Sequence, residues 1–402
     1  MGPQPPSSFQ SRSPSRPDPG PQFAQGTKPG SGQGPGKPNA RDLARAPAAA
    51  TSAEWASDTV ISKLSPLDRW LPVWIVLAIA AGLLLSHWFP AIQASLDAIK
   101  LGQTSLPIAL GLLLMMYPVL AKVRDGELGH VMRDRRLLGL ALVLVWGIGR
   151  LLMFGLAWIF LPNQPDFRSG LIMIGIAPCI AMVLIWIDLA QGDREAAALL
   201  VAINSIIQVL AYALLNHFYL KLLPSWLGLD SQTIHVSTGE IAKAVAIFLG
   251  IPLLAGYGTR RLGLSLRGLQ WYEQRFLPRI SPLALYGLLF TIALMFALQG
   301  EAIMASPLTV VKLAVPLLLY FVIMWAVAFA LGRRCGFSYG RTTTLAFTAA
   351  GNNFELAIAV SISVWGVTSR QALAGVIGPL IEVPALVSLV YLALWLRRRL
   401  ER

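Results

Sequence analysis

Apolar stretches of membrane-spanning length recur about ten times from Trp70 onward, and they constrain the fold more than any other feature of the chain. A helix needs roughly 20 apolar residues to cross a hydrocarbon core of about 30 Å. Only 13% of the residues are charged, against about 25% in a soluble domain. The sequence therefore predicts an all-α membrane protein with ten transmembrane helices, near residues 70–88, 104–121, 137–161, 169–188, 196–220, 240–259, 282–299, 308–332, 342–365 and 371–396.

Basic residues gather in alternate connections between these predicted helices. Clusters follow the second, sixth and eighth helices and end the chain, whereas the odd-numbered connections carry few Lys or Arg residues. Because basic loops stay on the cytoplasmic side, we expect a multi-pass protein of the cell (inner) membrane with both termini cytoplasmic. This topology accounts for much of the net charge of +13 and calls for a lipid bilayer rather than a nucleic acid as partner.

The chain divides into a tail and two halves. Residues 1–65 are rich in Pro, Gly and Ser and predict a disordered cytoplasmic tail. Residues 66–231 hold predicted helices 1–5, and residues 232–402 hold predicted helices 6–10. Since each half has an odd number of helices, the second half is inverted relative to the first.

Aligning the halves so that Arg194 matches Arg370 places Cys179 of the fourth predicted helix against Glu355 of the ninth. Both residues lie where polar or helix-breaking residues interrupt an apolar run. Interrupted helices at matching positions of inverted repeats indicate a transporter site. We therefore expect two inverted five-helix repeats, with helices 4 and 9 broken and crossing near the middle of the bilayer.

The second interruption consists of Gly351, Asn352, Asn353 and Glu355. A break at membrane depth is tolerated where protein or a water-filled cavity supplies backbone partners. An ionisable residue there costs at least about 2.5 kcal/mol and by default marks a substrate or proton path. The plainer alternative is that Asn352 and Glu355, three residues apart, form the capping box of a new half-helix.

The first interruption is Pro178-Cys179. Proline removes a backbone hydrogen bond and breaks a helix, and a cysteine beside a helix N-terminus favours the thiolate, which is a soft ligand. A lone membrane cysteine otherwise serves as a small apolar residue. Its alignment with Glu355 favours the functional interpretation.

Several segments carry a family resemblance: CIAMVLIWIDLAQGDREAAALLVAINSIIQVL, AAGNNFELAIAVSISVWGVTSRQALAGVIGPLIEVPAL, LLLMMYPVLAKV and LDRW. They resemble arsenite-efflux permeases, the arsenical-resistance branch of the bile acid/arsenite/riboflavin transporter superfamily, over about residues 66–400. The resemblance implies export of arsenite, and often antimonite, in exchange for protons. The essential cysteine of the family falls on Cys179 and its essential glutamate on Glu355.

The chain departs from the family pattern at Val145, Arg150, Pro178 and Ile187. The family tends to have Arg before the cysteine and Pro in the third helix, so we hypothesise that one guanidinium has moved from position 178 to Arg150. That cation would pair with Glu355, Glu382 or Asp188, unless it snorkels to the surface. These departures also leave open an alternative function, a sodium- or proton-coupled carrier of an organic anion.

The predicted mechanism combines these residues. Cys179 contacts arsenic(III), Asn352 and Asn353 orient its hydroxyls, and Glu355 exchanges a proton. Glu382 either joins the proton relay or pairs with a cation, and Asn204 either lines the cavity or bonds between helices. We expect no cofactor and no enzymatic activity, because no HExxH, GxSxG or paired Cys/His set occurs.

Overall fold

A computed structural model describes residues 70–89, 100–101, 104–122, 135–229, 237–305 and 307–400. The chain divides into two units, Met1–Ala56 and Ser57–Arg402. The predicted tail, residues 1–65, lies outside the described residues. All that follows concerns the unit Ser57–Arg402.

Helices account for the described elements apart from a short antiparallel pair, β1 (Lys100–Leu101) and β2 (Thr104–Ser105). In chain order the helices are α4 (Leu71–Trp88), α6 (Leu106–Ala121), α8 (Arg135–Leu142), η2 (Val143–Ile148), α9 (Gly149–Phe160), α10 (Pro165–Ile176), α11 (Val183–Leu189), α12 (Arg194–His217), η3 (Phe218–Leu222), α13 (Leu223–Trp226), α14 (Thr238–Val245), η4 (Ala246–Gly250), α15 (Ile251–Trp271), η5 (Tyr272–Phe276), α16 (Leu277–Ala305), α17 (Pro307–Arg334), α18 (Tyr339–Ala350), α19 (Phe354–Trp365) and α20 (Arg370–Leu400).

Five helical stretches are long and apolar enough to cross a membrane: Arg135–Phe160, Arg194–Trp226, Thr238–Gly300, Pro307–Arg334 and Arg370–Leu400. The longest covers the sixth and seventh predicted spans, and its backbone leaves the helical conformation at Gly268 (φ 79°, ψ 169°). Shorter apolar helices are Val73–Trp88, Leu106–Ala121 and Phe354–Trp365. Large apolar side chains such as Leu210 and Leu254 face outward, each 71% exposed. The chain is therefore a multi-pass membrane protein, and the count of ten spans stays a prediction.

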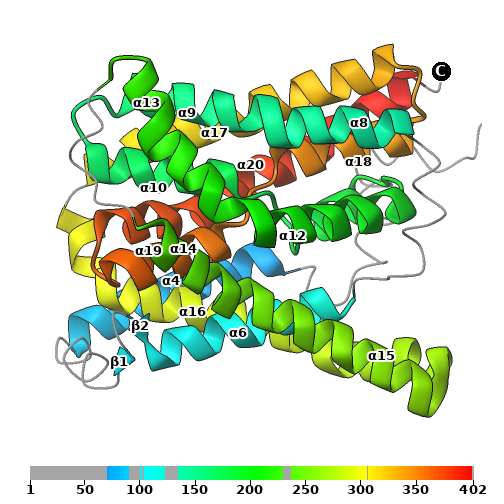
Figure 1. Ribbon diagram of the computed structural model, residues 1–402, viewed down its shortest axis with the longest axis horizontal. Helices are drawn as coiled ribbons and strands as arrows, with labels where there is room; N and C mark the ends of the chain where they lie inside the picture. Colours follow the sequence, from blue (N-terminus) through cyan, green and yellow to red (C-terminus); the bar gives the residue numbers. More distant parts are fainter. Residues whose placement is uncertain are drawn as a thin grey trace, which may run out of the picture. The chain divides into compact units, whose positions relative to one another are not determined.

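The helices form two packed groups within this unit (Figure 1). α16 packs on α4 and α6, and α15 also packs on α6. In the other group α17 packs on α18, α20 and α9, while α10 packs on α20 and α9. Glycines allow close contact in the first group: a Cβ on Gly287 of α16 would lie 2.8 Å from backbone atoms of α6. Small residues promote such packing in membranes.

Candidate functional site

Two helix pairs are interrupted in the second group. α10 ends at Ile176, Ala177 is extended (φ −94°, ψ 104°), and α11 begins at Val183. α18 ends at Ala350, Gly351 is extended (φ −75°, ψ 140°), and α19 begins at Phe354. Both interruptions lie where the sequence places them, at Pro178-Cys179 and at Gly351 to Asn353.

The two interruptions cross each other. Pro178 and Asn352 form an isolated antiparallel bridge. The Cys179 amide donates to the Gly351 carbonyl at 3.0 Å, and the Asn353 amide donates to the Ala177 carbonyl at 2.8 Å. A broken membrane helix leaves backbone groups without partners. Here each break supplies hydrogen-bond partners to the other, so the crossing satisfies backbone groups that both interrupted helices would otherwise leave without partners.

Cys179 is enclosed at this crossing. Its side chain is 2% exposed, and the thiol interacts with the backbone amides of Ala181 and Val183, where α11 starts. A Cβ on Gly351 would lie 3.0 Å from the Cys179 Cβ. The absence of a side chain at Gly351 therefore leaves room for the Cys179 side chain.

Asn353 caps α19. Its Oδ1 accepts a hydrogen bond from the Leu356 amide at 3.0 Å, and its Nδ2 donates to the Gln208 Oε1 of α12 at 3.3 Å. The predicted capping box of Asn352 and Glu355 is therefore wrong by one residue. The physical reason is the bridge to Pro178, which holds Asn352 in the extended break and delays the start of the helix.

Asn352 and Glu382 lie near each other beside the crossing. The backbone amide of Asn352 interacts with the carboxyl group of Glu382 in α20, and each side chain is 1% exposed. Asn352 Nδ2 and Glu382 Oε1 have no hydrogen-bond partner among the described residues. Because an unmade hydrogen bond at a buried group costs about 1–3 kcal/mol, these atoms are suited to bind a polar ligand.

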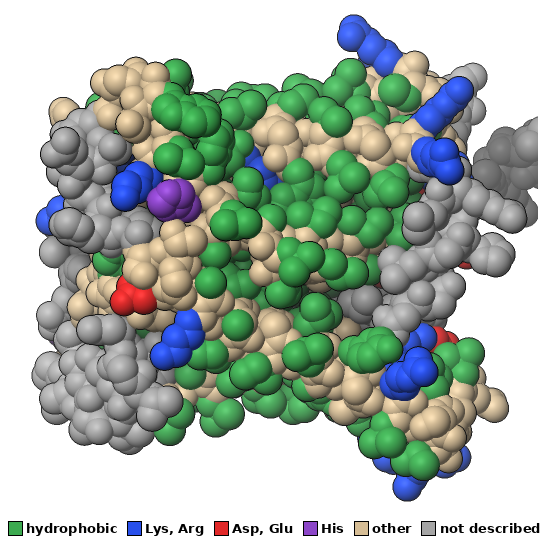
Figure 2. Space-filling view, viewed as in Figure 1, with side chains coloured by type: hydrophobic (Ala, Val, Ile, Leu, Met, Phe, Trp, Pro, Cys, Tyr) green, Lys and Arg blue, Asp and Glu red, His purple; other side chains and the backbone are tan. Residues whose placement is uncertain are grey.

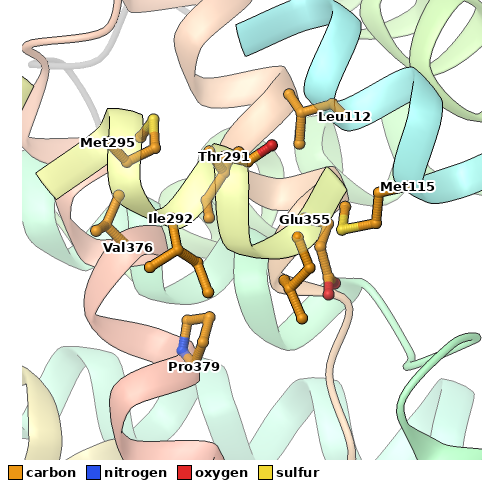
Figure 3. Close-up of a pocket in the computed structure, with 10 residues that line it drawn as sticks. Leu112, Met115, Thr291, Ile292, Met295, Glu355, Val376 and Pro379 are labelled. Atoms are coloured by element: carbon orange, nitrogen blue, oxygen red, sulfur yellow. The ribbon is translucent and has the colours of Figure 1, made fainter. Parts of the chain in front are cut away.

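Glu355 points in another direction. It lies in the first turn of α19, 7% exposed, and lines a pocket between α6, α16, α19 and α20 (Figure 3). The other lining residues are Leu112, Met115, Leu288, Thr291, Ile292, Met295, Ile358, Val376 and Pro379. None of these was singled out from the sequence, since all but Thr291 are apolar residues of apolar helices and carry no distinguishing signal. Cys179, Asn352, Asn353 and Glu382 are not lining residues of this pocket.

Arg150 is buried, 2% exposed, so it does not snorkel. Its guanidinium lies over the Trp146 ring, 3.9 Å from the centroid, and Nη2 donates to the Ile176 carbonyl at 3.0 Å. Ile176 is the last residue of α10. Arg150 thus binds the carboxyl end of the broken helix, where the helix dipole is negative, two residues before Pro178.

The predicted carboxylate partners of Arg150 are wrong, because it forms no ion pair with Glu355, Glu382 or Asp188 in the described part of the chain. Asp188 instead pairs with Arg194 at 2.5 Å. The reason is proximity, since Asp188 belongs to the last turn of α11 and Arg194 begins α12.

Asn204 links two helices. Its Oδ1 accepts a hydrogen bond from Trp146 Nε1 of η2 at 2.9 Å, whereas its Nδ2 lacks a partner among the described residues. Asn204 therefore bonds between helices and supports the tryptophan on which Arg150 lies. No cluster of three His, Cys, Asp or Glu side chains suited to a metal ion occurs within residues that the structure describes, so Cys179 stands as a single thiol.

Comparison with known proteins finds relatives that are similar to this chain over most of its length. Residues 109–306 match the Sodium Bile acid symporter family. The arsenical-resistance protein Acr3 of Corynebacterium glutamicum is 53% identical over 339 residues, 84% of this chain and 92% of that protein. An uncharacterized transporter of Synechocystis is 33% identical over 84% of this chain and 92% of its own length. Acr3 of Alkaliphilus metalliredigens is 29% identical over 80% of this chain and 91% of its own length.

Proposed function

The chain belongs to the Acr3 family of arsenical-resistance proteins, and we propose from this premise that arsenite binds where its two broken helices cross. The protein exports arsenite and thereby confers resistance to arsenicals. The observation that carries the proposal is the backbone bridge between Pro178 and Asn352, because it holds Cys179 of one half beside the asparagines of the other.

The chemistry of a single thiol suits transport. Arsenite near neutral pH is an uncharged trihydroxide of arsenic(III), a thiophilic centre. The Cys179 sulfur forms one S–As bond, one As–OH bond breaks, and the thiol proton leaves with that hydroxyl as water. Because a soft thiolate ligand binds strongly, three of them would trap the metalloid, whereas one releases it. The unpaired Asn352 Nδ2 and Glu382 Oε1 are available to the remaining hydroxyls, and Asn353 fixes the geometry of the break.

Two buried carboxyl groups are available for exchange with protons. Glu355 lines the pocket between α6, α16, α19 and α20, and Glu382 lies against the Asn352 amide. Carboxyl groups inside a membrane bundle form proton relays in transporters. We assign Glu355 the coupling role because it faces the pocket, and Glu382 a supporting role at the substrate. Antimonite, with the same thiophilic trihydroxide chemistry, is a further substrate.

The topology is proposed as ten spans in two inverted repeats, residues 66–231 and 232–402, behind a cytoplasmic tail, residues 1–65. Two facts support the repeat. The helices α10 and α18 both have 12 residues, and the N-terminal part of each contacts the start of a helix in the other repeat. Gln371 at the start of α20 donates to Asp166 of α10 at 3.1 Å. The amide of Asp193, the N-cap of α12, donates to the Gly340 carbonyl of α18 at 3.1 Å.

The orientation follows from charge. Figure 2 shows most Lys and Arg side chains at the end of the unit where α15 and α20 finish. By the positive-inside rule this end faces the cytoplasm, and it carries the C-terminus, with the protein in the cell membrane.

The organic-anion alternative would need Arg150 as counter-charge in the cavity. Arg150 is instead buried against Trp146 and bonded to the Ile176 carbonyl, and it does not line the Glu355 pocket. The geometry therefore favours the metalloid.

Uptake into inverted membrane vesicles tests the function. We expect accumulation of arsenite and antimonite, driven by a pH gradient that is acidic inside the vesicle, and no accumulation of a bile-acid-like anion. Collapse of the pH gradient should remove the accumulation. Uptake of the organic anion with no effect of arsenite as competitor would contradict the proposal.

A further inference from the structure

A surface groove lies at the turn that joins α15 to η5. None of its residues belongs to the crossing or to the Glu355 pocket. Its lining consists of Thr259, Leu262, Gly263, Leu266, Arg267, Trp271 and Phe276. The groove thus has one cation among mainly apolar walls.

Two glycines build the groove. Gly268 has a positive φ of 79° and turns the chain at the end of α15. A Cβ on Gly263 would lie 2.7 Å from the Tyr272 ring, so only glycine lets the aromatic residues after the turn pack down on α15. There Trp271 and Phe276 stack with ring centroids 5.6 Å apart. The stacked rings form a rigid apolar wall.

The opposite wall is exposed. Leu262 and Leu266 are 59% and 72% exposed. The Arg267 guanidinium lies 4.8 Å from the Trp271 ring centroid and makes no ion pair with any residue that the structure describes. A cation held on an aromatic ring and still open to a ligand is suited to a phosphate, because arginine binds phosphate oxygens in pairs.

The surroundings are strongly basic. Arg261, Arg275 and Arg279 are exposed on the same α15–η5–α16 segment, and the only acidic residue between Ile251 and Gln299 is Glu273. Figure 2 shows this end of α15 among the basic side chains of the unit. Basic pockets beside membrane helices attract anionic lipid headgroups.

We propose that this groove binds an anionic phospholipid, with the phosphate on Arg267 and one acyl chain along Leu266 and Phe276. The basic segment supplies the charge complementarity, and the exposed leucines supply an apolar contact for the chain. The groove is thus a lipid site separate from the transport site.

The test uses the full chain in a neutral detergent. The thermal unfolding midpoint is measured with added phosphatidylglycerol or with phosphatidylcholine of the same acyl chains, and native mass spectrometry counts the bound lipids. We expect phosphatidylglycerol to raise the midpoint more and to be retained as one tightly bound molecule. Arg267→Gln should weaken its binding about tenfold, consistent with loss of one charged contact. Arg398→Gln, at an exposed arginine of α20, is the matched control and should change nothing.

Three further arms make the result decisive. Arg267→Lys keeps the charge and should keep most of the preference, and Leu266→Ser should weaken both lipids by removing an acyl contact. Glycerol 3-phosphate should not stabilise the protein, because it lacks the chain. Equal stabilisation by the two lipids, equal loss in Arg267→Gln and Arg398→Gln, or stabilisation by glycerol 3-phosphate alone would overturn the proposal.

Discussion

The two interruptions share one plan but are built differently. The break between α18 and α19 is short, and the Asn353 side chain caps the helix that follows. The break between α10 and α11 runs from Ala177 to Met182, and Met182 has a thioether but no capping oxygen. The following helices differ too, with 12 residues in α19 and 7 in α11. The α10–α11 break therefore has no side-chain cap, although each break donates one backbone hydrogen bond to the other.

The difference also separates the chemistry. The break between α10 and α11, which has no side-chain cap, carries the thiol of Cys179. The capped break carries the side-chain amides of Asn352 and Asn353, and Glu355 follows it in α19. The carboxyl ends of the preceding half-helices differ in the same way: the Arg150 guanidinium binds the last carbonyl of α10, whereas the Tyr320 hydroxyl donates to Ala349 of α18 at 3.4 Å. The break with the thiol thus follows a helix end bound by a charged side chain, and the break with the amides follows a helix end bound by a neutral one.

The largest effect should come from removing the soft ligand. Cys179→Ser should lower arsenite transport at least about 100-fold, because a hydroxyl does not replace sulfur at arsenic(III) and this factor equals only about 2.7 kcal/mol of binding. Cys335→Ser changes the exposed cysteine and should transport normally. Vesicle uptake measures both variants. Full activity of Cys179→Ser would remove the chemical distinction between the two breaks.

The next effect concerns the carboxyl groups. Glu355→Gln should abolish accumulation driven by the pH gradient and leave exchange of internal for external arsenite, because the amide cannot carry the proton. Glu382→Gln should keep the response to the gradient and bind arsenite more weakly, since it acts beside Asn352. Comparing gradient-driven uptake with exchange separates these roles. Identical behaviour of the two variants would contradict the assignment.

The third effect compares the two side chains that bind these helix ends. Arg150→Met should lower the free energy of unfolding by about 1.5–3 kcal/mol, because it removes a hydrogen bond from a charged group. Tyr320→Phe should cost about 0.5–1.5 kcal/mol, since its hydrogen bond is neutral. Denaturation in detergent micelles measures both. A larger cost for Tyr320→Phe would reverse the proposed asymmetry.

Arg150 also permits a test of the hypothesis that a guanidinium has moved from position 178 to position 150. A guanidinium at position 178 would start two residues from the Ile176 carbonyl that Arg150 now binds. The double variant Arg150→Pro with Pro178→Arg should therefore transport arsenite better than Arg150→Pro alone. Equal loss in both variants would mean that the position of the cation cannot be exchanged.

The smallest effect is expected at the cap. Asn353→Ala should cost about 1 kcal/mol through loss of the N-cap bond, and Asn353→Asp should retain that bond. A cost in Asn352→Ala as large as in Asn353→Ala would place the cap one residue earlier. Thermal unfolding of the three variants in one detergent makes this comparison.

Both interruptions were accessible from the sequence because each is a local anomaly. Proline at position 178 cannot continue a helix, and the Gly-Asn-Asn segment at 351–353 is polar within an apolar run. The membrane class and the Acr3 family were equally evident, from the recurring apolar runs and from motifs such as NNFELAIAV.

What the sequence missed depends on contacts between distant segments. The helix α19 starts one residue later than predicted because Asn352 lies in the bridge opposite Pro178, far away in the chain, and the residues beside the two are hydrogen-bonded to each other. Arg150 was assigned a carboxylate partner, but a carbonyl at the end of α10 and an aromatic ring take that place. Met115 and Thr291 line the Glu355 pocket only because α6 and α16 pack there. Periodicity within one helix carries no information of this kind.

The crossing itself is most directly tested by a disulfide. A Cβ at position 351 would lie 3.0 Å from the Cys179 Cβ, and a small shift gives the separation of about 3.8 Å that a disulfide requires. In a Cys335→Ser background, Gly351→Cys should cross-link to Cys179 under mild oxidation, seen as two halves that stay joined after proteolysis between residues 230 and 236. Two thiols that remain alkylatable and never cross-link would contradict the account.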